Sequence, residues 1–441
     1  MKRGLHHLLR ETTDRAPDHP LFERRGKTST YGDIDRASSA FAASLAESGI
    51  ERGDRIAVVL DNLAAYPMTY YGTLKAGAAV VPLCPDTRPK SLERALVHSQ
   101  ARAVVLEAKN ARLLSDLHDR LPDLLTVYCL GQTDLTSNGS FDVVDLETTF
   151  ASDILLGDTG AGDDDLAAIM YTSGTTALPK GVMLSHRNLL ANTDSTVAYL
   201  DLKSDERLGI VLPFFYSYGN SLLHTHIAVG GTLIDLGTVA FPAAVLKGLS
   251  EKECTGLSGV PSTFARLLQS RAVHSTNFAS LRYLTQAGGP MTPALTKKLL
   301  AAIPSAKLYV MYGQTEAAPR LSYLPPADLL RKLGSIGKAI PDVTLRVLDD
   351  RGDEVMPGVE GELVATGDNI MKGYLHDPEA TAKALRPEGL RTGDLARVDE
   401  EGYFYIIGRN TDMIKAGAHR IGPKEIEAVI EELTEVAQCA V

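Results

Sequence analysis

Two alternating patterns run along the first three quarters of the chain. Continuous apolar runs such as residues 55–60 (RIAVVL) and 78–83 (AAVVPL) are typical of strands that are buried on both faces of a sheet. Between such runs lie stretches with apolar residues at helical spacing, for example residues 33–49, where Asp33 is a candidate helix cap. The alternation of strand and helix predicts α/β subdomains with parallel-type sheets.

The pattern changes from about residue 333. Short strands then alternate apolar and polar residues, and turn sequences such as DDRGD and DEEG separate them. This predicts a small antiparallel β subdomain over residues 333–410, after the α/β subdomains of residues 1–332. Residues 1–410 are therefore expected to form one large N-terminal domain.

The composition is that of a globular protein and excludes several classes. The chain has 441 residues, enough for two or three domains, with 44% hydrophobic and 23% charged residues. A formal net charge of −10 without a basic patch argues against a nucleic-acid partner. No apolar run approaches the roughly 20 residues that a membrane span needs. Four cysteines without C-x-x-C spacing predict reduced thiols in a cytoplasmic protein and no zinc site.

One loop between two predicted strands is rich in glycine, serine and threonine. It covers residues 171–182 and reads YTSGTTALPKGV. Glycine lets the backbone approach a ligand closely, and successive N–H groups and hydroxyls can converge on phosphate oxygens. Lys180 adds a compact positive charge. The spacing differs from that of the nucleotide-triphosphate loop G-x-x-x-x-G-K-[ST], and the loop alone could also be an ordinary surface loop.

Further motifs carry groups that suit a nucleotide. In YGQTE, the Tyr312 ring can stack on a flat base and Glu316 can hold a divalent cation on phosphate oxygens. Asp394 in RTGDL stands where a carboxylate can accept both hydroxyls of a ribose, and Arg409 can reach phosphate or ribose. QAGGPM supplies a second turn of close approach, and LPFFYSYGNS is aromatic-rich. Taken singly, such motifs more often reflect packing in the core or solvated surface than a binding site.

Taken together, the motifs resemble those of a known superfamily. Five follow one another in this order: YTSGTTALPKG, LPFFYSYG, YGQTE, LRTGDL and GRNTDMIKAG. The series is similar to that of the adenylate-forming superfamily, which includes acyl-CoA synthetases, nonribosomal-peptide adenylation domains and luciferases. LKAGAAVVPL and TYGDID match its weaker early motifs. The resemblance covers nearly the whole chain, and five ordered motifs are highly specific.

The resemblance implies an ATP-dependent acid–thiol ligase. A carboxylate would attack the α-phosphorus of ATP to form acyl-AMP and pyrophosphate, and the acyl group would pass to CoA. The protein would mainly position the reactants and neutralise phosphate charge, with Mg²⁺ as a further cofactor. One alternative is an enzyme that loads the phosphopantetheine of an acyl-carrier protein. A non-catalytic nucleotide- or acid-binding relative is disfavoured, because Lys180, Glu316 and Asp394 are all present.

The resemblance also implies roles for individual positions. The β- and γ-phosphates would be held by Thr172, Ser173, Gly174, Thr175, Thr176 and Lys180. Thr315 would contact the α-phosphate, and Glu316 would bind Mg²⁺. The adenine would be enclosed by Gly289, Pro290 and Tyr312, while Asp394 would bind the ribose with Arg409 nearby. The acyl pocket would be formed by Tyr216, Tyr218, Gly219, Gly259, Val260, Gly288, Gly313 and Gln314.

Position 216 departs from the usual pattern and bears on the substrate. Many acyl-CoA synthetases have histidine where Tyr216 stands, and amino-acid-activating members have aspartate to hold the α-ammonium group. A tyrosine is neutral at pH 7 and cannot do that, so a plain aliphatic or aromatic carboxylic acid is expected. Fatty acyl-AMP ligases carry an extra insertion in the large domain. The sequence lacks a recognisable insertion of this kind, which disfavours that class of enzyme. Tyr216, Tyr218, Asn220 and His224 hint at a somewhat polar pocket that would suit an aryl or hydroxylated acid, although packing could equally bury these residues.

The end of the chain departs from the family as well. The resemblance places the hinge at Thr411 and implies that residues 411–441 contain this hinge and the beginning of a small α+β C-terminal domain. In the family, that domain has roughly a hundred residues. Only thirty residues remain. PKEIEAVIEEL is expected to be a helix, and VAQCAV a strand that stops mid-run. We therefore expect a truncated chain without the late family lysine of the P-x-x-x-G-K motif, able to bind ATP and acid yet slow to react.

Overall fold

The computed structural model describes residues 3–409 apart from 115–116, 118–119, 138–139, 158 and 173–178. It also describes positions 430 and 436 and two short strands, β23 (Ile414–Ala416) and β24 (His419–Ile421). The chain divides into two compact units. Unit 1 comprises Met1–Glu206, Leu212–Asp235 and Met371–Pro378, and unit 2 comprises Arg207–Val211, Leu236–Ile370 and Glu379–Val441. The predicted limits at residues 332 and 410 stay predictions.

Unit 1 contains a sheet of eight strands in the order β19-β9-β8-β4-β3-β5-β6-β7. Its strands are β3 (Arg55–Val59), β4 (Ala79–Pro82), β5 (Ala103–Glu107), β6 (Thr126–Leu130), β7 (Asp142–Asp145), β8 (Leu166–Thr172), β9 (Lys180–Ser185) and β19 (Gly373–Tyr374). The strands from β8 to β7 pair in parallel, whereas β9 pairs antiparallel with both β8 and β19. The parallel sheet that the apolar runs predict is confirmed.

Side chains of this sheet are buried on both faces. Alternate residues such as Ala57 and Val59 belong to one core, together with Leu92 and Leu96 of α4. On the opposite face, the Tyr128 ring of β6 packs edge-on against Phe41 of α2, with ring centroids 5.0 Å apart. This two-sided burial explains why the strands read as continuous apolar runs.

The helices of unit 1 are α1 (His7–Arg15), α2 (Tyr31–Glu47), α3 (Ala65–Lys75), α4 (Pro89–Ser99), α5 (Ala108–Ala111), α6 (Leu146–Phe150), α7 (His186–Leu200) and α8 (Ser217–Val229). The predicted cap of α2, Asp33, is corrected. Thr30 is the N-cap, and Asp33 is the third helical residue of a capping box, in which its carboxylate accepts a bond from the Thr30 N–H. Unit 1 also contains a small three-stranded arrangement of β1 (Pro20–Arg24), β2 (Lys27–Thr30) and β11 (Thr232–Asp235).

Unit 2 has a second parallel core. Its parallel strands β10 (Arg207–Ile210), β12 (Gly256–Gly259), β13 (Tyr283–Gln286) and β14 (Lys307–Tyr312) are followed by antiparallel β15 (Ser322–Leu324) and β16 (Lys338–Ala339). The helical elements are α9 (Pro242–Glu251), α10 (Pro261–Gln269), η2 (Arg271–His274), α11 (Pro293–Ala302), η3 (Thr315–Ala317) and α12 (Pro378–Ala384). Each parallel strand ends in a loop that carries a predicted site motif, a common placement for binding residues in α/β sheets.

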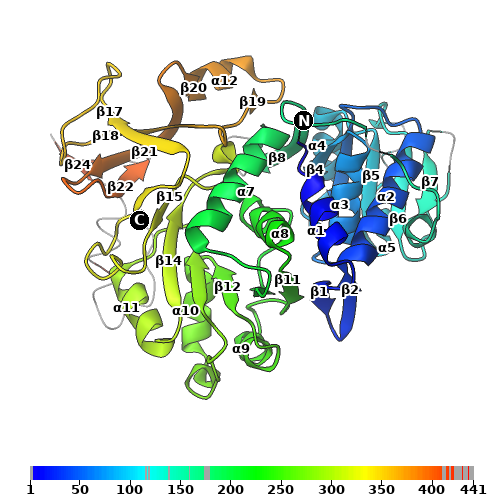
Figure 1. Ribbon diagram of the computed structural model, residues 1–441. Coiled ribbons are helices and arrows are strands. Elements are labelled where there is room, and N and C mark those ends of the chain that lie inside the picture. The colour runs from blue at the N-terminus through cyan, green and yellow to red at the C-terminus, as the bar shows by residue number, and fades with distance from the viewer. Residues whose placement is uncertain are drawn as a thin grey trace. The chain divides into compact units, whose positions relative to one another are not determined.

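The predicted antiparallel β subdomain is also confirmed in unit 2. Its strands are β17 (Val343–Leu348), β18 (Gly361–Gly367), β20 (Leu385–Arg386), β21 (Gly389–Val398) and β22 (Phe404–Arg409). They form one antiparallel sheet in the order β17-β18-β21-β20, with β22 on β21 (Figure 1). The predicted hinge Thr411, the late helix and most of the late strand lie outside the described residues. None of the described helices is both long and apolar enough to cross a bilayer.

Candidate active site

Lys180 and Thr172 lie at the base of the predicted phosphate loop. Thr172 ends β8, Lys180 begins β9, and the two are register partners across the antiparallel pair. The backbone ladder therefore fixes both ends of the loop. The other predicted phosphate-binding residues, Ser173, Gly174, Thr175 and Thr176, lie outside the described residues.

Tyr374 is a contact of Lys180 that the motifs did not reveal. It lies on β19 beside β9, as the register partner of Val182. The Lys180 ammonium nitrogen is 4.6 Å from the centroid of the Tyr374 ring, within the range of a cation–π contact. Because Tyr374 is buried, its ring is a fixed surface against which the Lys180 side chain packs where the loop meets β9.

The segment before α8 carries the aromatic motif, and a side chain distant in sequence fixes its backbone by hydrogen bonds. The Asn62 side chain donates to the Leu212 carbonyl (2.9 Å) and accepts from the Phe214 N–H (2.8 Å). A Cβ at Gly219 would collide with the Pro213 carbonyl oxygen, so the first turn of α8 packs too closely for any other residue. Of the predicted pocket residues here, Tyr216 is 58% exposed and Tyr218 is buried.

Asn220 and His224 are buried by packing and do not form an open polar pocket. The imidazole Nε2 of His224 is 2.8 Å from Asn220 Oδ1, and its Nδ1 is 3.0 Å from the Tyr71 hydroxyl. The Tyr70 hydroxyl also donates to Asn220 Oδ1, at 3.1 Å. Because an amide oxygen only accepts, Nε2 carries a proton. Burial disfavours a second proton, so the imidazole is neutral and its Nδ1 accepts from the Tyr71 hydroxyl.

We expect the protein to lose stability on acidification because of its buried histidines. Burial lowers the pKa of His224 to about 3 and that of His226 to about 4, against about 6.5 in an unfolded chain. Between these pKa values the unfolded chain binds more protons than the folded chain. The contribution of each neutral histidine to the free energy of unfolding is therefore complete above about pH 6.5. It falls by about 1.4 kcal/mol per pH unit below that pH.

Urea unfolding of the wild type and of His224→Gln at pH 7, 6 and 5 measures this contribution. The variant is expected to show a shallower fall in the free energy of unfolding. His274→Gln, at an exposed position, serves as the control and should keep the wild-type slope. Equal slopes in the wild type and in His224→Gln would show that His224 does not titrate as its burial requires.

In unit 2, predicted acyl-pocket and adenine residues meet at the ends of β12 and β13. Gly288 has a φ of +81°, and a Cβ there would lie 3.3 Å from Val260 Cγ1. A Cβ at the next position, Gly289, would lie 3.3 Å from Pro261 Cγ. The Gln286 side chain donates to the Gly289 carbonyl at 2.8 Å and so pins the turn. Gly288, Gly289 and Pro290 are exposed, which leaves the turn open to a ligand.

The YGQTE motif follows β14. A Cβ at Gly313 would collide with the Pro319 carbonyl oxygen, which explains the glycine. Thr315 and Glu316 lie on η3 and, like Gln314, are partly exposed. The described residues contain no group of three or more histidine, cysteine or carboxylate side chains that could hold a metal. A metal at Glu316 would therefore need ligands from the nucleotide.

Three predicted nucleotide residues lie together in unit 2. The Tyr312 hydroxyl donates to Asp394 Oδ2 at 2.6 Å, and Arg409 Nε is 3.4 Å from Asp394 Oδ1. Asp394 and Arg409 are register partners on β21 and β22. Burial and the adjacent carboxylate raise the pKa of Tyr312 well above its ordinary value, so the phenol stays protonated and donates. Asp394 is buried, yet one cation and one hydroxyl leave lone pairs for further donors.

We expect Tyr312→Phe to weaken ATP binding by less than the loss of the Asp394 charge does. The phenyl ring keeps the flat surface, and Arg409 still accompanies Asp394, so the loss is one hydrogen bond to a charged group, about 1.5 kcal/mol and roughly tenfold in the dissociation constant at most. Calorimetric titration with ATP measures it. Asp394→Asn is the comparison and should cost more, because it removes the charge itself. A loss for Tyr312→Phe that exceeds that of Asp394→Asn would contradict this arrangement.

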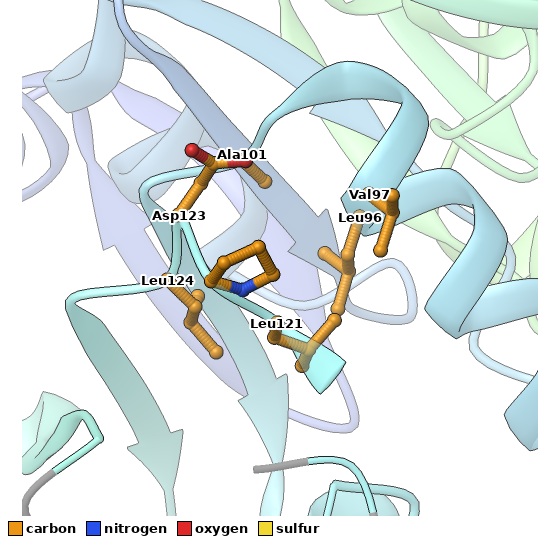
Figure 2. Close-up of a pocket in the computed structure, with 7 residues that line it drawn as sticks. Leu96, Val97, Ala101, Leu121, Asp123 and Leu124 are labelled. Atoms are coloured by element: carbon orange, nitrogen blue, oxygen red, sulfur yellow. The ribbon is translucent and has the colours of Figure 1, made fainter. Parts of the chain in front are cut away.

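Two hollows in the described chain lie away from these groups. Figure 2 shows a crevice between the end of α4 and the segment before β6, lined by Leu96, Val97, Ala101, Leu121, Pro122, Asp123 and Leu124. It has no room for a water-sized molecule. A groove of about 280 Å³ runs beside α2 and α6 and holds none of the predicted site residues.

Known proteins resemble the chain over nearly its full length. The family model described as AMP-binding enzyme matches residues 9–375. A feruloyl-CoA synthase of Amycolatopsis sp is 32% identical over 97% of this chain and 83% of its own length. A long-chain-fatty-acid–CoA ligase of Bacillus subtilis (strain 168) is 32% identical over 98% of this chain and 81% of its own.

Solved structures agree with the family match. The ATP-bound MatB of Rhodopseudomonas palustris has a TM-score of 0.89 at 29% identity and covers all of this chain with 85% of its own. An anthranilate CoA ligase in complex with anthranoyl-AMP, 22% identical, covers 100% of this chain with 84% of its own, and its TM-score of 0.93 shows the shared fold. The chain therefore belongs to the family of AMP-binding enzymes.

Proposed function

We infer that the chain activates a carboxylic acid with ATP and transfers the acyl group to CoA. The carboxylate attacks the α-phosphorus, pyrophosphate leaves, and the CoA thiol then displaces AMP from the acyl-AMP. Relatives named feruloyl-CoA synthase and long-chain-fatty-acid–CoA ligase catalyse, by their names, this class of reaction. The chain is thus an AMP-forming acid–thiol ligase.

The observation that carries this function is the arrangement of Tyr312, Asp394 and Arg409. A buried carboxylate with spare acceptor capacity lies beside an aromatic ring and a guanidinium, and these groups suit a ribose, a base and a phosphate. Lys180 contributes an ammonium group at the base of the loop that the motif assigns to the β- and γ-phosphates. Each of these assignments is our proposal and is supported by the order of the motifs.

The principal barrier to the first step is electrostatic, because an anionic carboxylate approaches an anionic triphosphate. Lys180 would neutralise part of the phosphate charge, and Thr315 would orient the α-phosphate. Glu316 fits Mg²⁺, since that ion is usually held by one or two carboxylates together with substrate phosphates and waters. Bound there, Mg²⁺ would supply charge neutralisation. Asp394, Tyr312 and the turn of Gly289 and Pro290 would hold the nucleoside in place.

The acid is proposed to be a plain aliphatic or aromatic carboxylic acid. Tyr216 carries no charge at neutral pH and cannot pair with an α-ammonium group. We place Tyr216, Tyr218, Gly219, Gly259, Val260, Gly288, Gly313 and Gln314 in the acyl pocket. CoA is proposed as the acceptor ahead of a carrier protein because the relatives are named for CoA. The spacing of the cysteines supports a cytoplasmic location.

Pyrophosphate exchange and thioester formation over a panel of acids test the function. The 441-residue chain is incubated with ATP, Mg²⁺ and aliphatic or aromatic acids, first alone and then with CoA or a holo-carrier protein. We expect acid-dependent exchange, and AMP release with CoA. Transfer to the carrier protein but not to CoA would overturn the proposed acceptor. Because a chain without the late family lysine is expected to react slowly, exchange is followed over an extended time course. Absence of exchange with every acid over that time would overturn the proposed reaction.

A further inference from the structure

Asn369 is a buried amide that holds the turn carrying Glu316. It lies after β18, and its side chain is only 1% exposed. Its Nδ2 donates to the carbonyl oxygens of Ala317 and Arg320, both at 2.9 Å. Ala317 directly follows Glu316 and ends η3, so the two bonds grip the segment that leaves this turn.

The turn has little regular structure of its own. η3 has three residues, and its backbone bonds run from the Ala317 N–H to Gln314 (2.9 Å) and from the Ala318 N–H to Thr315 (3.2 Å). A 3₁₀ turn of this length has poor hydrogen-bond geometry and does not fix a side chain well by itself. Bonds from Asn369, some fifty residues further along the chain, therefore add a constraint that the local backbone lacks.

The surroundings of Asn369 indicate that the side chain acts on the turn through its two N–H donors. Its Oδ1 is buried and has no hydrogen-bond partner within the described part of the chain. Leaving a buried acceptor unsatisfied is unfavourable, so the two donated bonds must outweigh that loss. A Cβ at Gly367 would lie 2.6 Å from this oxygen, so the glycine makes room for the amide.

We propose that Asn369 is a positioning residue that orients Glu316 toward the metal and phosphates of bound ATP. This inference rests on the proposed function, in which Glu316 holds Mg²⁺. Outer residues that orient a metal-binding side chain typically change metal affinity by about 10–100-fold when they are replaced. Asn369 acts through the backbone at Ala317 and Arg320, and its burial leaves almost none of its own surface for a ligand.

Three substitutions at this position separate donor loss from packing loss. Asn369→Leu keeps a branched side chain without donors but is larger, and Asn369→Asp keeps the shape but sets a carboxylate against two carbonyl oxygens. Asn369→Ser is smaller, keeps one donor, and remains informative if the other two fail to fold. Asp145→Ala is the control, because it removes the N-cap of α6, where Asp145 Oδ1 accepts from the Thr148 N–H at 2.7 Å. It lowers stability away from any site residue.

Mg²⁺ dependence is the diagnostic measurement. Calorimetry gives the affinity for ATP with and without Mg²⁺, pyrophosphate exchange gives the Mg²⁺ concentration for half-maximal rate, and thermal unfolding gives Tm. We expect the Asn369 variants to need about tenfold more Mg²⁺ or higher, with serine intermediate, and to keep their affinity for metal-free ATP. Asp145→Ala should lower Tm and leave the Mg²⁺ midpoint unchanged. Unchanged midpoints in folded Asn369 variants would overturn the proposal.

Glu316→Gln, run in parallel, distinguishes the two possible failures. If it removes the effect of Mg²⁺ on ATP binding while the Asn369 variants retain the wild-type effect, only the positioning role of Asn369 is wrong. If Glu316→Gln keeps the wild-type Mg²⁺ dependence, the proposed metal site is wrong and the role of Asn369 is lost with it.

Discussion

Replacing Lys75 by methionine is expected to lower the free energy of unfolding by about 3–5 kcal/mol. The Lys75 ammonium contacts four acceptors on α2: Asp35 Oδ1 (2.6 Å), the Asp35 carbonyl (2.9 Å), Ser38 Oγ (2.8 Å) and Ser39 Oγ (2.9 Å). Both side chains of the pair are nearly buried, at 11% and 13% exposure. Methionine keeps most of the apolar stem but leaves the Asp35 carboxylate buried without its cation.

Burial lowers the pKa of Lys75 even though Asp35 lies beside it, so desolvation outweighs the attraction. The pair should therefore be costly to break but inexpensive to replace as a whole. Urea unfolding of Lys75→Met, and of the double variant with Asp35→Leu, tests this, and the double variant should recover much of the loss. Lys109→Met is the control: its bond to Asp61 is equally short at 2.6 Å but largely exposed, and should be worth at most about 1 kcal/mol. Equal losses for both lysines would contradict the argument from burial.

Replacing Lys180 by alanine is expected to weaken the use of ATP by about 1.5–3 kcal/mol, which is roughly 10–150-fold. The substitution removes the ammonium group at the base of the proposed phosphate loop, together with its contact to the Tyr374 ring. The register of β8 and β9 depends on backbone bonds, so the fold should persist. Acid-dependent pyrophosphate exchange, measured as kcat/KM for ATP, gives the effect.

Lys372→Ala is the matched control for Lys180→Ala. Lys372 precedes β19 in the same unit and is exposed, and its ammonium donates to the Asp164 carbonyl at 2.9 Å. It should leave kcat/KM for ATP close to that of the wild type. Equal effects of the two substitutions would show that general positive charge near the loop matters, and that Lys180 has no specific role.

Most of the fold could be predicted because the order of apolar and polar residues along a strand reflects which of its faces are buried. β3 and β4 are buried on both faces and so read as unbroken apolar runs. β17 alternates apolar and polar residues over most of its length, which is typical of a strand with one exposed face, whereas β18 has three consecutive buried residues at its centre. The cap of α2 was misassigned by three residues because Thr30 and Asp33 both carry capping oxygens, and the reciprocal bonds of a capping box involve both.

The candidate site was predictable only where chemistry is concentrated in short motifs. Asp394, Arg409 and Tyr312 stood out by residue type, and the structure brings them into contact. The residues that hold such motifs in place were missed. Asn369 bonds to a turn about fifty residues away in the sequence. Tyr374 contacts a lysine on a strand that is a neighbour in the sheet but lies far away in the sequence. No local pattern therefore marks either residue.

Burial also decided a question that periodicity left open. Asn220 and His224 are polar residues near the aromatic motif. From the sequence they could either line a substrate pocket or be packed in the core. The structure shows that Tyr70 and Tyr71 of α3 bind them from a neighbouring helix. A single sequence does not specify that partner, because the contact spans some 150 residues.

The fate of the carboxylate oxygens tests the central claim most directly. The chain is incubated with ATP, CoA and an acid that carries oxygen-18 in both carboxylate positions, and the AMP is analysed by mass spectrometry. If the carboxylate attacks the α-phosphorus, the bridging oxygen stays with phosphorus when the thiol takes the acyl group, and the AMP carries a single labelled oxygen. Unlabelled AMP, or label in pyrophosphate or inorganic phosphate, would contradict acid activation through acyl-AMP.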